Sequence, residues 1–513
     1  MFKLILYIMM CAAALNTGCR AGTTGDAPIR AAAVAGRFYP ATADELRLAV
    51  SRYLDHAVPP KTGRPLAIVV PHAGYVFSGQ IAADAFKQAA AYDYDLVVIL
   101  GTNHTTPNFR GVSIYSQGGF NTPLGTAPIA KTAAEQLLAA DERFTFDPRV
   151  HEREHSVEVE IPFVQYLFPK AQIIPIVVGD ANLELCEKLG TVLAGIAKNG
   201  KTLIVASSDL SHYPDYEDAV RVDHEMLKAI AALSPAGFQA TVRRQMTERV
   251  PQLATCACGE APIMAAMFAA KQLGAVSGTI VSYANSGDAS LGESDRVVGY
   301  GAVVFSADSG SSVGTEKANT ESSVSETDSL TAKDKEALLR YARTTLEWYL
   351  TSETTPLARD FSPFAEIPMG AFVTLRKHHQ LRGCIGHMAE DMPLCRTVGA
   401  MAMMAAFEDR RFSPLTADEL NDIEIEISAL TPSKPISDPG QIVLGRDGVI
   451  LQKDGHSAVF LPQVATEQGW NREQLLDQLC RKAGLSKDCW RSGAMLSVFQ
   501  ADVFSESEFG LAR

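Results

Sequence analysis

A long polar segment near the middle of the chain divides it into two parts. Between Ser306 and about Lys333 the sequence consists mainly of Ser, Thr, Gly, Asp and Glu, with almost no apolar side chain. Such a segment cannot bury enough apolar surface to fold, so we expect a flexible linker over residues 308–330. The length of 513 residues is also too great for one average domain. The sequence therefore predicts one domain over residues 30–307 and a smaller one over residues 331–510.

The composition excludes several classes of protein. The formal net charge of −13 argues against broad binding to nucleic acid, which is driven by positive charge. Nine cysteines in 513 residues are too few for a fold that depends mainly on disulfide bonds. Beyond the N-terminus no apolar run reaches the roughly 18 residues of a membrane span. We therefore expect globular domains that bind neither nucleic acid nor the membrane interior.

The N-terminus has the pattern of an export signal. Lys3 precedes the apolar stretch Leu4–Leu15, and the following Asn16-Thr17-Gly18-Cys19 resembles a bacterial lipoprotein cleavage site. Residues 1–19 are therefore predicted to be a signal peptide, with Cys19 as the lipidated residue. We expect an exported lipoprotein that faces the periplasm or the cell exterior and touches the membrane only through its lipid anchor. Plain secretion and a retained N-terminus are the alternatives.

Short apolar runs alternate with amphipathic stretches in the first domain. This pattern predicts an α/β domain in which a mixed, buried sheet lies between helix layers. The expected strands are Leu66–Val70, Leu96–Leu100, Ile173–Val178, Leu203–Ala206, Thr279–Tyr283 and Val297–Phe305; the expected helices are Ala43–His56, Gly79–Ala91, Thr132–Ala140, Leu183–Lys198, Tyr216–Leu233 and Ala261–Gln272.

The second domain is predicted to be α+β. Its expected strands are Gly370–Arg376, Ile423–Leu430 and Ser457–Leu461, and its expected helices are Thr331–Leu350, Pro393–Ala406 and Arg472–Ala483.

Three histidines follow predicted strands of the first domain. His72, His104 and His212 each lie a few residues beyond a buried apolar run. Sites of open α/β sheets form beyond the carboxyl ends of their strands, so we expect these side chains to converge. Neutral imidazole is a good ligand for iron, zinc or copper. The sequence therefore predicts a metal site, although any one histidine alone is more often structural.

Three further residues are candidates for this site. Cys258 precedes a predicted helix, where a thiol pKa is lowered and a thiolate binds soft metals; burial without a ligand role is the alternative. His155 is either an acid–base or supporting residue of the site or part of a helix cap around Ser156. Asp209 either orients a histidine or caps a turn.

These motifs resemble the MEMO family in their order along the chain. They are Pro71–Tyr75, Gly101–His104, Glu154–Glu158, Ser207–His212 and Cys258-Gly259. The family is similar to LigB-type extradiol dioxygenases, which bind non-haem iron. The resemblance implies that His72, His104 and Cys258 bind the metal, with His212 beside them, and that His212 and His155 transfer protons or orient substrate. Tyr75 is expected to line the pocket.

The second domain contains the segment Leu381–Gly386, in which two glycines flank Cys384. Cys384 is a candidate nucleophile or metal ligand and Arg382 a candidate anion-binding residue, against the alternative of a buried cysteine in a tight turn. With residues 405–414 and 426–432, this segment resembles the AMMECR family. The two resemblances together imply the B and A components of the AmmeMemoRadiSam system, whose radical S-adenosylmethionine protein would be a partner, with a peptide or protein as candidate substrate.

These observations favour an exported two-domain protein with a redox-active metal site. Iron is the expected metal, with copper or zinc as alternatives, and the candidate activity is that of a non-haem iron dioxygenase-like oxidoreductase. A thiolate in place of the usual carboxylate ligand favours metal binding over ring cleavage. The alternatives are a metal-binding carrier without catalysis, a protein-interaction module and, if zinc fills the site, a metallohydrolase.

Overall fold

The computed structural model describes residues 28–307 and 329–511. The predicted signal peptide, the lipidation residue Cys19 and nearly all of the predicted linker lie outside the described residues.

The first domain is built on an eight-stranded mixed sheet, as the sequence predicted. The strand order is β10-β11-β2-β9-β3-β8-β4-β7. The central strands β2, β9, β3 and β8 are parallel, whereas β10 and β11 pair antiparallel to their neighbours. Strand β4 is antiparallel to β8 and parallel to β7. The parallel strands therefore end at one edge of the sheet. Their bounds are β2 (Pro65–Val70), β3 (Leu96–Thr102), β4 (Val112–Ile114), β7 (Phe144–Thr145), β8 (Gln172–Val178), β9 (Thr202–Ser207), β10 (Gly278–Asn285) and β11 (Gly299–Ser306).

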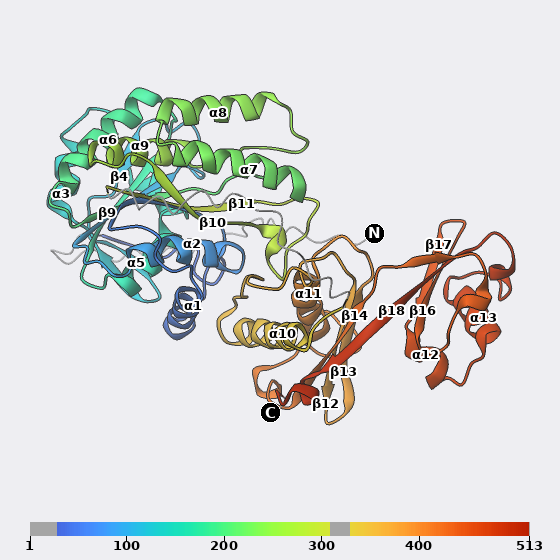
Figure 1. Ribbon diagram of the computed structural model, residues 1–513. Coiled ribbons are helices and arrows are strands. Elements are labelled where there is room, and N and C mark those ends of the chain that lie inside the picture. The colour runs from blue at the N-terminus through green and yellow to red at the C-terminus, as the bar shows by residue number, and fades with distance from the viewer. Residues whose placement is uncertain (1–27, 308–328, 512–513) are drawn as a thin grey trace, which may run out of the picture.

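Helices cover both faces of this sheet (Figure 1). One layer contains α2 (Tyr75–Ala89), with α1 (Ala43–Asp55) and α5 (Ile161–Leu167) beside it. The other contains α6 (Leu183–Ala197), α7 (Tyr216–Ala231), α8 (Pro235–Thr247) and α9 (Glu260–Gln272). Helix α9 packs on β2, β9 and β3, whose apolar side chains are buried except for the partly buried Leu66 and Leu96.

Smaller elements complete the first domain. They are α3 (Lys131–Leu138), α4 (Pro148–Glu152), the short helices η1 (Glu158–Glu160) and η2 (Ser286–Asp288), and a sheet of β1 (Ile29–Arg30), β5 (Gly119–Thr122) and β6 (Gly125–Pro128).

Several short elements of the first domain were not predicted, among them β4, β5, β6 and β7, and two helices also differ from expectation. Helix α2 begins at Tyr75 rather than Gly79, because Gly74 ends the loop after β2 in an extended conformation. Helix α8 was not predicted, although Ser234 caps it and Pro235 occupies its first turn. Those two residues are a recognisable helix start.

The second domain is rich in strands. Its sheet has the order β13-β12-β14-β18-β16-β17, and β15 also pairs with β18. The strands are β12 (Ala371–Lys377), β13 (Gln380–His387), β14 (Ile423–Leu430), β15 (Lys434–Ile436), β16 (Asp447–Lys453), β17 (His456–Phe460) and β18 (Met495–Ser505). Helices α10 (Ala332–Ser352) and α11 (Leu394–Phe407) pack on β12, β13 and β14. A capping box between Thr331 and Asp334 begins α10.

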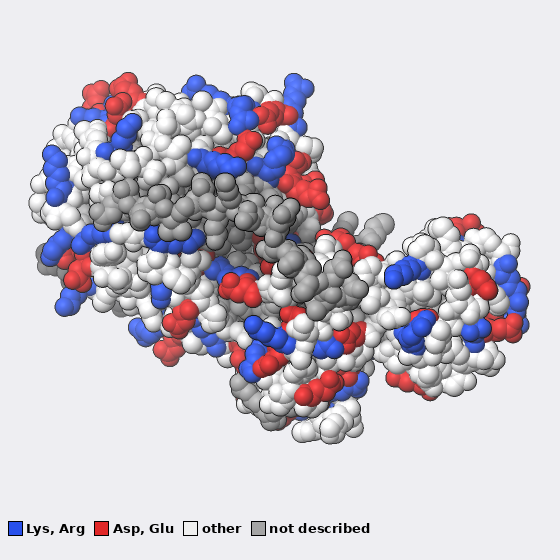
Figure 2. Space-filling view, in the orientation of Figure 1, with Lys and Arg blue, Asp and Glu red and all other residues white. Residues whose placement is uncertain are grey.

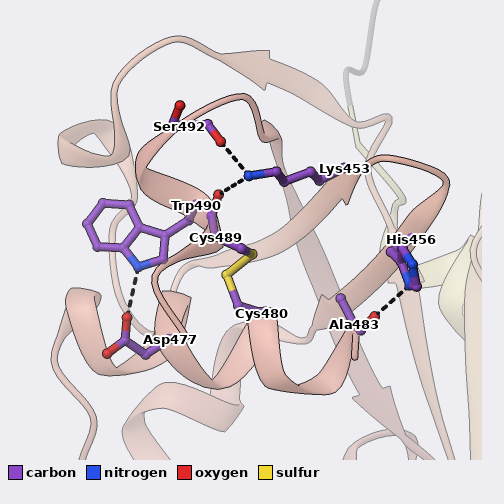
Figure 3. The surroundings of a disulfide bond; sticks show 8 residues. All are labelled: Lys453, His456, Asp477, Cys480, Ala483, Cys489, Trp490 and Ser492. Atoms are coloured by element: carbon purple, nitrogen blue, oxygen red, sulfur yellow. Dashed lines mark hydrogen bonds between the residues drawn. A yellow bond between two sulfur atoms is a disulfide. The ribbon is translucent and has the colours of Figure 1, made fainter. Parts of the chain in front are cut away.

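The long strand β18 connects this part to a smaller lobe (Figure 1). The lobe comprises β15, β16, β17, α12 (Pro462–Glu467) and α13 (Arg472–Lys482), and it has its own apolar core around Val449, Leu476 and Leu479. A disulfide joins Cys480 of α13 to Cys489 (Figure 3). Beside it, Lys453 donates to the carbonyls of Cys489 (3.2 Å) and Ser492 (2.6 Å).

Among the described residues, no helix is both long enough and apolar enough to cross a membrane. On the face shown in Figure 2, basic and acidic side chains are interspersed over the described surface.

Candidate metal centre

The site lies where the parallel strands of the first domain end. His72 follows β2, His104 follows β3, and Asp209 and His212 follow β9. Cys258 lies just before α9, which packs under the same strands. The sheet topology therefore brings together the side chains that the sequence predicted would converge.

His72 occupies the centre of this group and is 1% exposed. Its Nδ1 lies 2.8 Å from Ser207 Oγ, and its backbone N–H donates to Asp209 Oδ1 at 2.8 Å. These contacts direct Nε2 toward Cys258, whose Sγ is 3.2 Å away. Burial and the neighbouring His104 lower the pKa of His72 well below its ordinary value, so the ring is neutral at physiological pH, the form that can bind a metal.

Glu154 fixes the orientation of His104. One carboxylate oxygen accepts the His104 backbone N–H at 2.7 Å, and the other lies 2.9 Å from Nδ1. Although burial opposes ionisation, the hydrogen bond from His104 lowers the pKa of Glu154 to about 2. A carboxylate held in this way keeps the other ring nitrogen, Nε2, available to a metal.

His155 lies inside the site. Its ring stacks on His104 with 4.5 Å between centroids and meets the ring of His72 edge-on at 5.4 Å. Burial and the other two histidines lower the pKa of His155 to about 3. Ser156 does not cap a helix; its hydroxyl donates to the Thr102 carbonyl at 2.9 Å. Of the two interpretations of this segment, the geometry therefore fits a role for His155 in the site.

Asp209 and Cys258 form the other side of the site. Asp209 Oδ2 lies 3.9 Å from Nε2 of both His72 and His212. Burial and Asp209 raise the pKa of the Cys258 thiol above its ordinary value. Desolvation by burial thus acts against the lowering of this pKa that the position before a helix was expected to give. A bound cation would have to displace the thiol proton.

His212 is held by its backbone between two segments, since it bridges Thr255 and Val298. Its Nε2 is buried and has no hydrogen-bond partner among the described residues. Burial lowers the pKa of His212. A buried ring nitrogen without a partner is costly, and a ligand, a proton or a bound substrate would satisfy it.

The donor atoms form two groups of metal-binding size that share His72. One consists of His72, His104 and His155, and the other of His72, Asp209 and Cys258; within each, the donor atoms lie within 4.8 Å of one another. The predicted ligands His72, His104 and Cys258 are thus divided between the two groups, with His155 and Asp209 added. Imidazole, thiolate and carboxylate donors together fit a transition metal.

Two buried carboxylates support the site without having been predicted. Glu160 accepts a hydrogen bond from Ser207, the residue that contacts His72 Nδ1, at 3.0 Å. Glu158 is paired with Arg30 and also accepts the backbone N–H groups of Ala33 and Val34. In the sequence both look like acidic residues in the first turn of a helix, so no local signal distinguishes them.

Arg30, the ion-pair partner of Glu158, also contacts the loop that carries Glu154 and His155. Its guanidinium also donates to the carbonyls of His151 (2.9 Å) and Glu154 (2.8 Å). Arg30 and Glu158 therefore fix both ends of the loop that carries Glu154 and His155.

Tyr75 lies in the core at the start of α2. Its hydroxyl donates to the Val159 carbonyl at 2.7 Å, and its ring contacts Tyr39, Tyr53 and Phe163. Tyr75 therefore packs in the core three residues after His72, whereas it was expected to line the pocket.

Cys384 and Arg382 lie on strand β13 of the second domain. The alternative of a tight turn was wrong, because Leu381–Gly386 is part of this strand and pairs with β12. Asp409 accepts the Cys384 backbone N–H at 2.9 Å, and Arg382 pairs with Glu419 at 2.9 Å. Gly383 is required by packing, since a Cβ there would lie 2.2 Å from the Ala405 carbonyl of α11.

Asp223, a neighbour of the site, gives a pH-dependent prediction. It accepts from Ser211 and Tyr283, and burial raises its pKa to about 7. Between about pH 4 and 7, Asp223 therefore holds a proton in the folded protein that it releases in the unfolded chain. The free energy of unfolding consequently falls as the pH rises through this range. Relative to Asp223→Asn, the wild-type free energy of unfolding should fall by on the order of 2 kcal/mol between pH 5 and pH 7. Denaturant titrations of both proteins measure this, and a difference independent of pH would contradict it.

The first domain is thus an α/β fold with nitrogen, sulfur and oxygen donors gathered at its strand ends, in groups that could hold a metal ion. The Memo-like protein family model matches residues 30–304 and the AMMECR1 model matches residues 339–504. The chain belongs to the Memo-like family and carries an AMMECR1 domain after the Memo-like part.

Two curated relatives agree with this assignment for the first domain. A MEMO1 family protein of Nitrosopumilus maritimus is 35% identical over 285 residues, which cover 54% of this chain and 99% of that protein. One from Thermotoga maritima is 35% identical over 289 residues, with the same coverage. The solved structure of uncharacterized protein PH0010 from Pyrococcus horikoshii is 35% identical and covers 34% of this chain and 93% of that one, with a TM-score of 0.33.

Proposed function

We propose that the first domain binds a redox-active transition metal, with iron as the first candidate and copper or zinc as alternatives. The observation that carries this proposal is the position of His72, whose neutral, oriented ring belongs to both groups of donor atoms. His104, His155, Asp209 and Cys258 supply the remaining donors. The metal would serve redox or oxygenase-type chemistry of the kind that the likeness to extradiol dioxygenases implies.

The residues around the donors have separable roles. A bound redox metal would supply electron transfer and polarisation of a coordinated group. Ser207 and Glu154 hold the rings of His72 and His104 in place before any metal arrives. His212 presents an unpartnered Nε2 toward Asp209, so it would hold a proton or orient a substrate. The side chains of His104, His155 and His212 are each 20–30% exposed, which supports access from solvent.

We also propose that the protein is exported as a lipoprotein through Cys19. The disulfide between Cys480 and Cys489 supports this proposal, because disulfides persist mainly outside the reducing cytoplasm. Partnership with a radical S-adenosylmethionine protein, and action on a peptide or protein, stay predictions that rest on the resemblance alone.

Cobalt substitution tests whether Cys258 is a ligand. We expect Co²⁺ added to the metal-free protein to give a thiolate-to-metal charge-transfer band that Cys258→Ser removes. The matched control is Cys384→Ser, which changes a partly buried free thiol in the other domain. It should leave the band unchanged. A band that survives Cys258→Ser, or one lost only in the control, would contradict the assignment.

A further inference from the structure

The second domain contacts the first through an apolar centre. Trp348 near the end of α10 is 4% exposed and belongs to the hydrophobic core of the first domain. Its ring meets those of Tyr53 at 5.6 Å and His56 at 5.0 Å, both edge-on. The Arg52 guanidinium lies 5.6 Å from the centre of the same ring. A tryptophan buried among a neighbour's side chains is the usual anchor of a stable interface.

A buried ion pair lies beside this anchor. The Asp84 side chain on α2 is fully buried, and Arg359 of the second domain pairs with it at 3.0 Å. Among the described residues, Arg359 is the one cation paired with Asp84. Without Arg359, the Asp84 carboxylate would keep hydrogen bonds from Val58 and Gln80 but would lose its counter-ion, which is costly for a buried carboxylate.

A second ion pair of the interface involves helix α11. Arg396 of α11 pairs with Asp288 of η2 at 2.7 Å and lies over the ring of Tyr216, 4.5 Å from its centre. Nearby, Ser290 Oγ is 3.3 Å from Tyr341 Oη of α10. The interface thus involves α1, α2 and η2 of the first domain and α10 and α11 of the second, and Figure 1 shows α10 beside α1.

We propose that these contacts alone hold the two domains together and that the linker is not required. The face made by α1, α2 and η2 is then a recognition surface for an AMMECR1-type domain. The relatives support a self-sufficient first domain, because the Nitrosopumilus protein matches it over 99% of that protein's own length. A Memo-like domain therefore exists as a separate chain, and here its partner is docked through a buried anchor and two ion pairs.

Cleavage of the linker tests the proposal. A protease site is placed within residues 308–328, the purified full chain is cut, and the products are passed over a size-exclusion column with light scattering at micromolar concentration. We expect the two pieces to elute together with the mass of the uncut chain. Two separate peaks from the wild-type chain would overturn the proposal.

Variants then test whether this surface is responsible. Arg359→Ala with Arg396→Ala should weaken association of the cut pieces by at least about 30-fold, because arginines at buried positions are frequent interface hot spots. Both arginines face the first domain, so the core of the second is unchanged by their removal. Arg340→Ala is the matched control, since Arg340 pairs within α10 with Glu336. Equal association of the double variant and the control would overturn the assignment of the surface.

Discussion

Replacing His72 with alanine is expected to abolish specific metal binding. His72 is common to both groups of donor atoms, so its loss leaves neither group complete. Because loss of a supporting residue alone weakens metal sites by about 10- to 100-fold, loss of this ligand should exceed 100-fold. Competition with a chromophoric chelator measures the affinity of wild type and variant for Fe²⁺, Zn²⁺ and Cu⁺.

The matched control is His224→Ala. His224 is exposed on α7, and its Nδ1 lies 2.8 Å from the carbonyl of Val220 on the same helix. We expect this variant to bind metal as the wild type does. Unchanged affinity in His72→Ala would show that any metal binds elsewhere on the chain.

Replacing Glu158 with alanine should produce the largest loss of stability among single changes near the site. Arg30 would remain buried without its counter-ion, and the backbone N–H groups of Ala33 and Val34 would lose their acceptor. Removal of one partner of a buried ion pair costs about 3–5 kcal/mol. Denaturant unfolding followed by circular dichroism measures this loss.

Glu184→Ala is the control for this prediction. The Glu184 side chain is 80% exposed and pairs with Arg143 at the surface. Exposed ion pairs contribute little, so we expect a change below about 1 kcal/mol. Equal effects of the two substitutions would contradict the role assigned to Glu158.

Much of the architecture could be predicted because it depends on local patterns. The runs Leu66–Val70, Leu96–Leu100 and Leu203–Ala206 are short and apolar, and each is a buried parallel strand. The polar linker marked the domain boundary, since no segment without apolar side chains can contribute to a core. Strand β13 was missed because its two glycines suggest a turn. In the structure they allow close packing, on Ala405 of α11 at Gly383 and on the Phe372 ring at Gly386.

The candidate site could also be predicted in part from local sequence patterns. Residues after parallel strands meet at one edge of the sheet, so the positions of His72, His104 and His212 in the sequence place them together. Asp209 was a predicted orienting residue and does accept the His72 backbone N–H, but the partners of the imidazole rings could not be predicted. Glu154 reaches His104 across 50 residues, and Ser207 reaches His72 across 135. Such contacts depend on the tertiary structure, and the raised pKa of Cys258 depends on burial that the helix position does not reveal.

The most direct test of the central claim is the metal content of the full-length protein. The chain is purified without oxygen, and metals are measured by mass spectrometry before and after reconstitution with iron, copper or zinc. The structure predicts close to stoichiometric transition metal that depends on His72 and Cys258. A protein that stays metal-free after reconstitution with all three would contradict a metal centre at the strand ends.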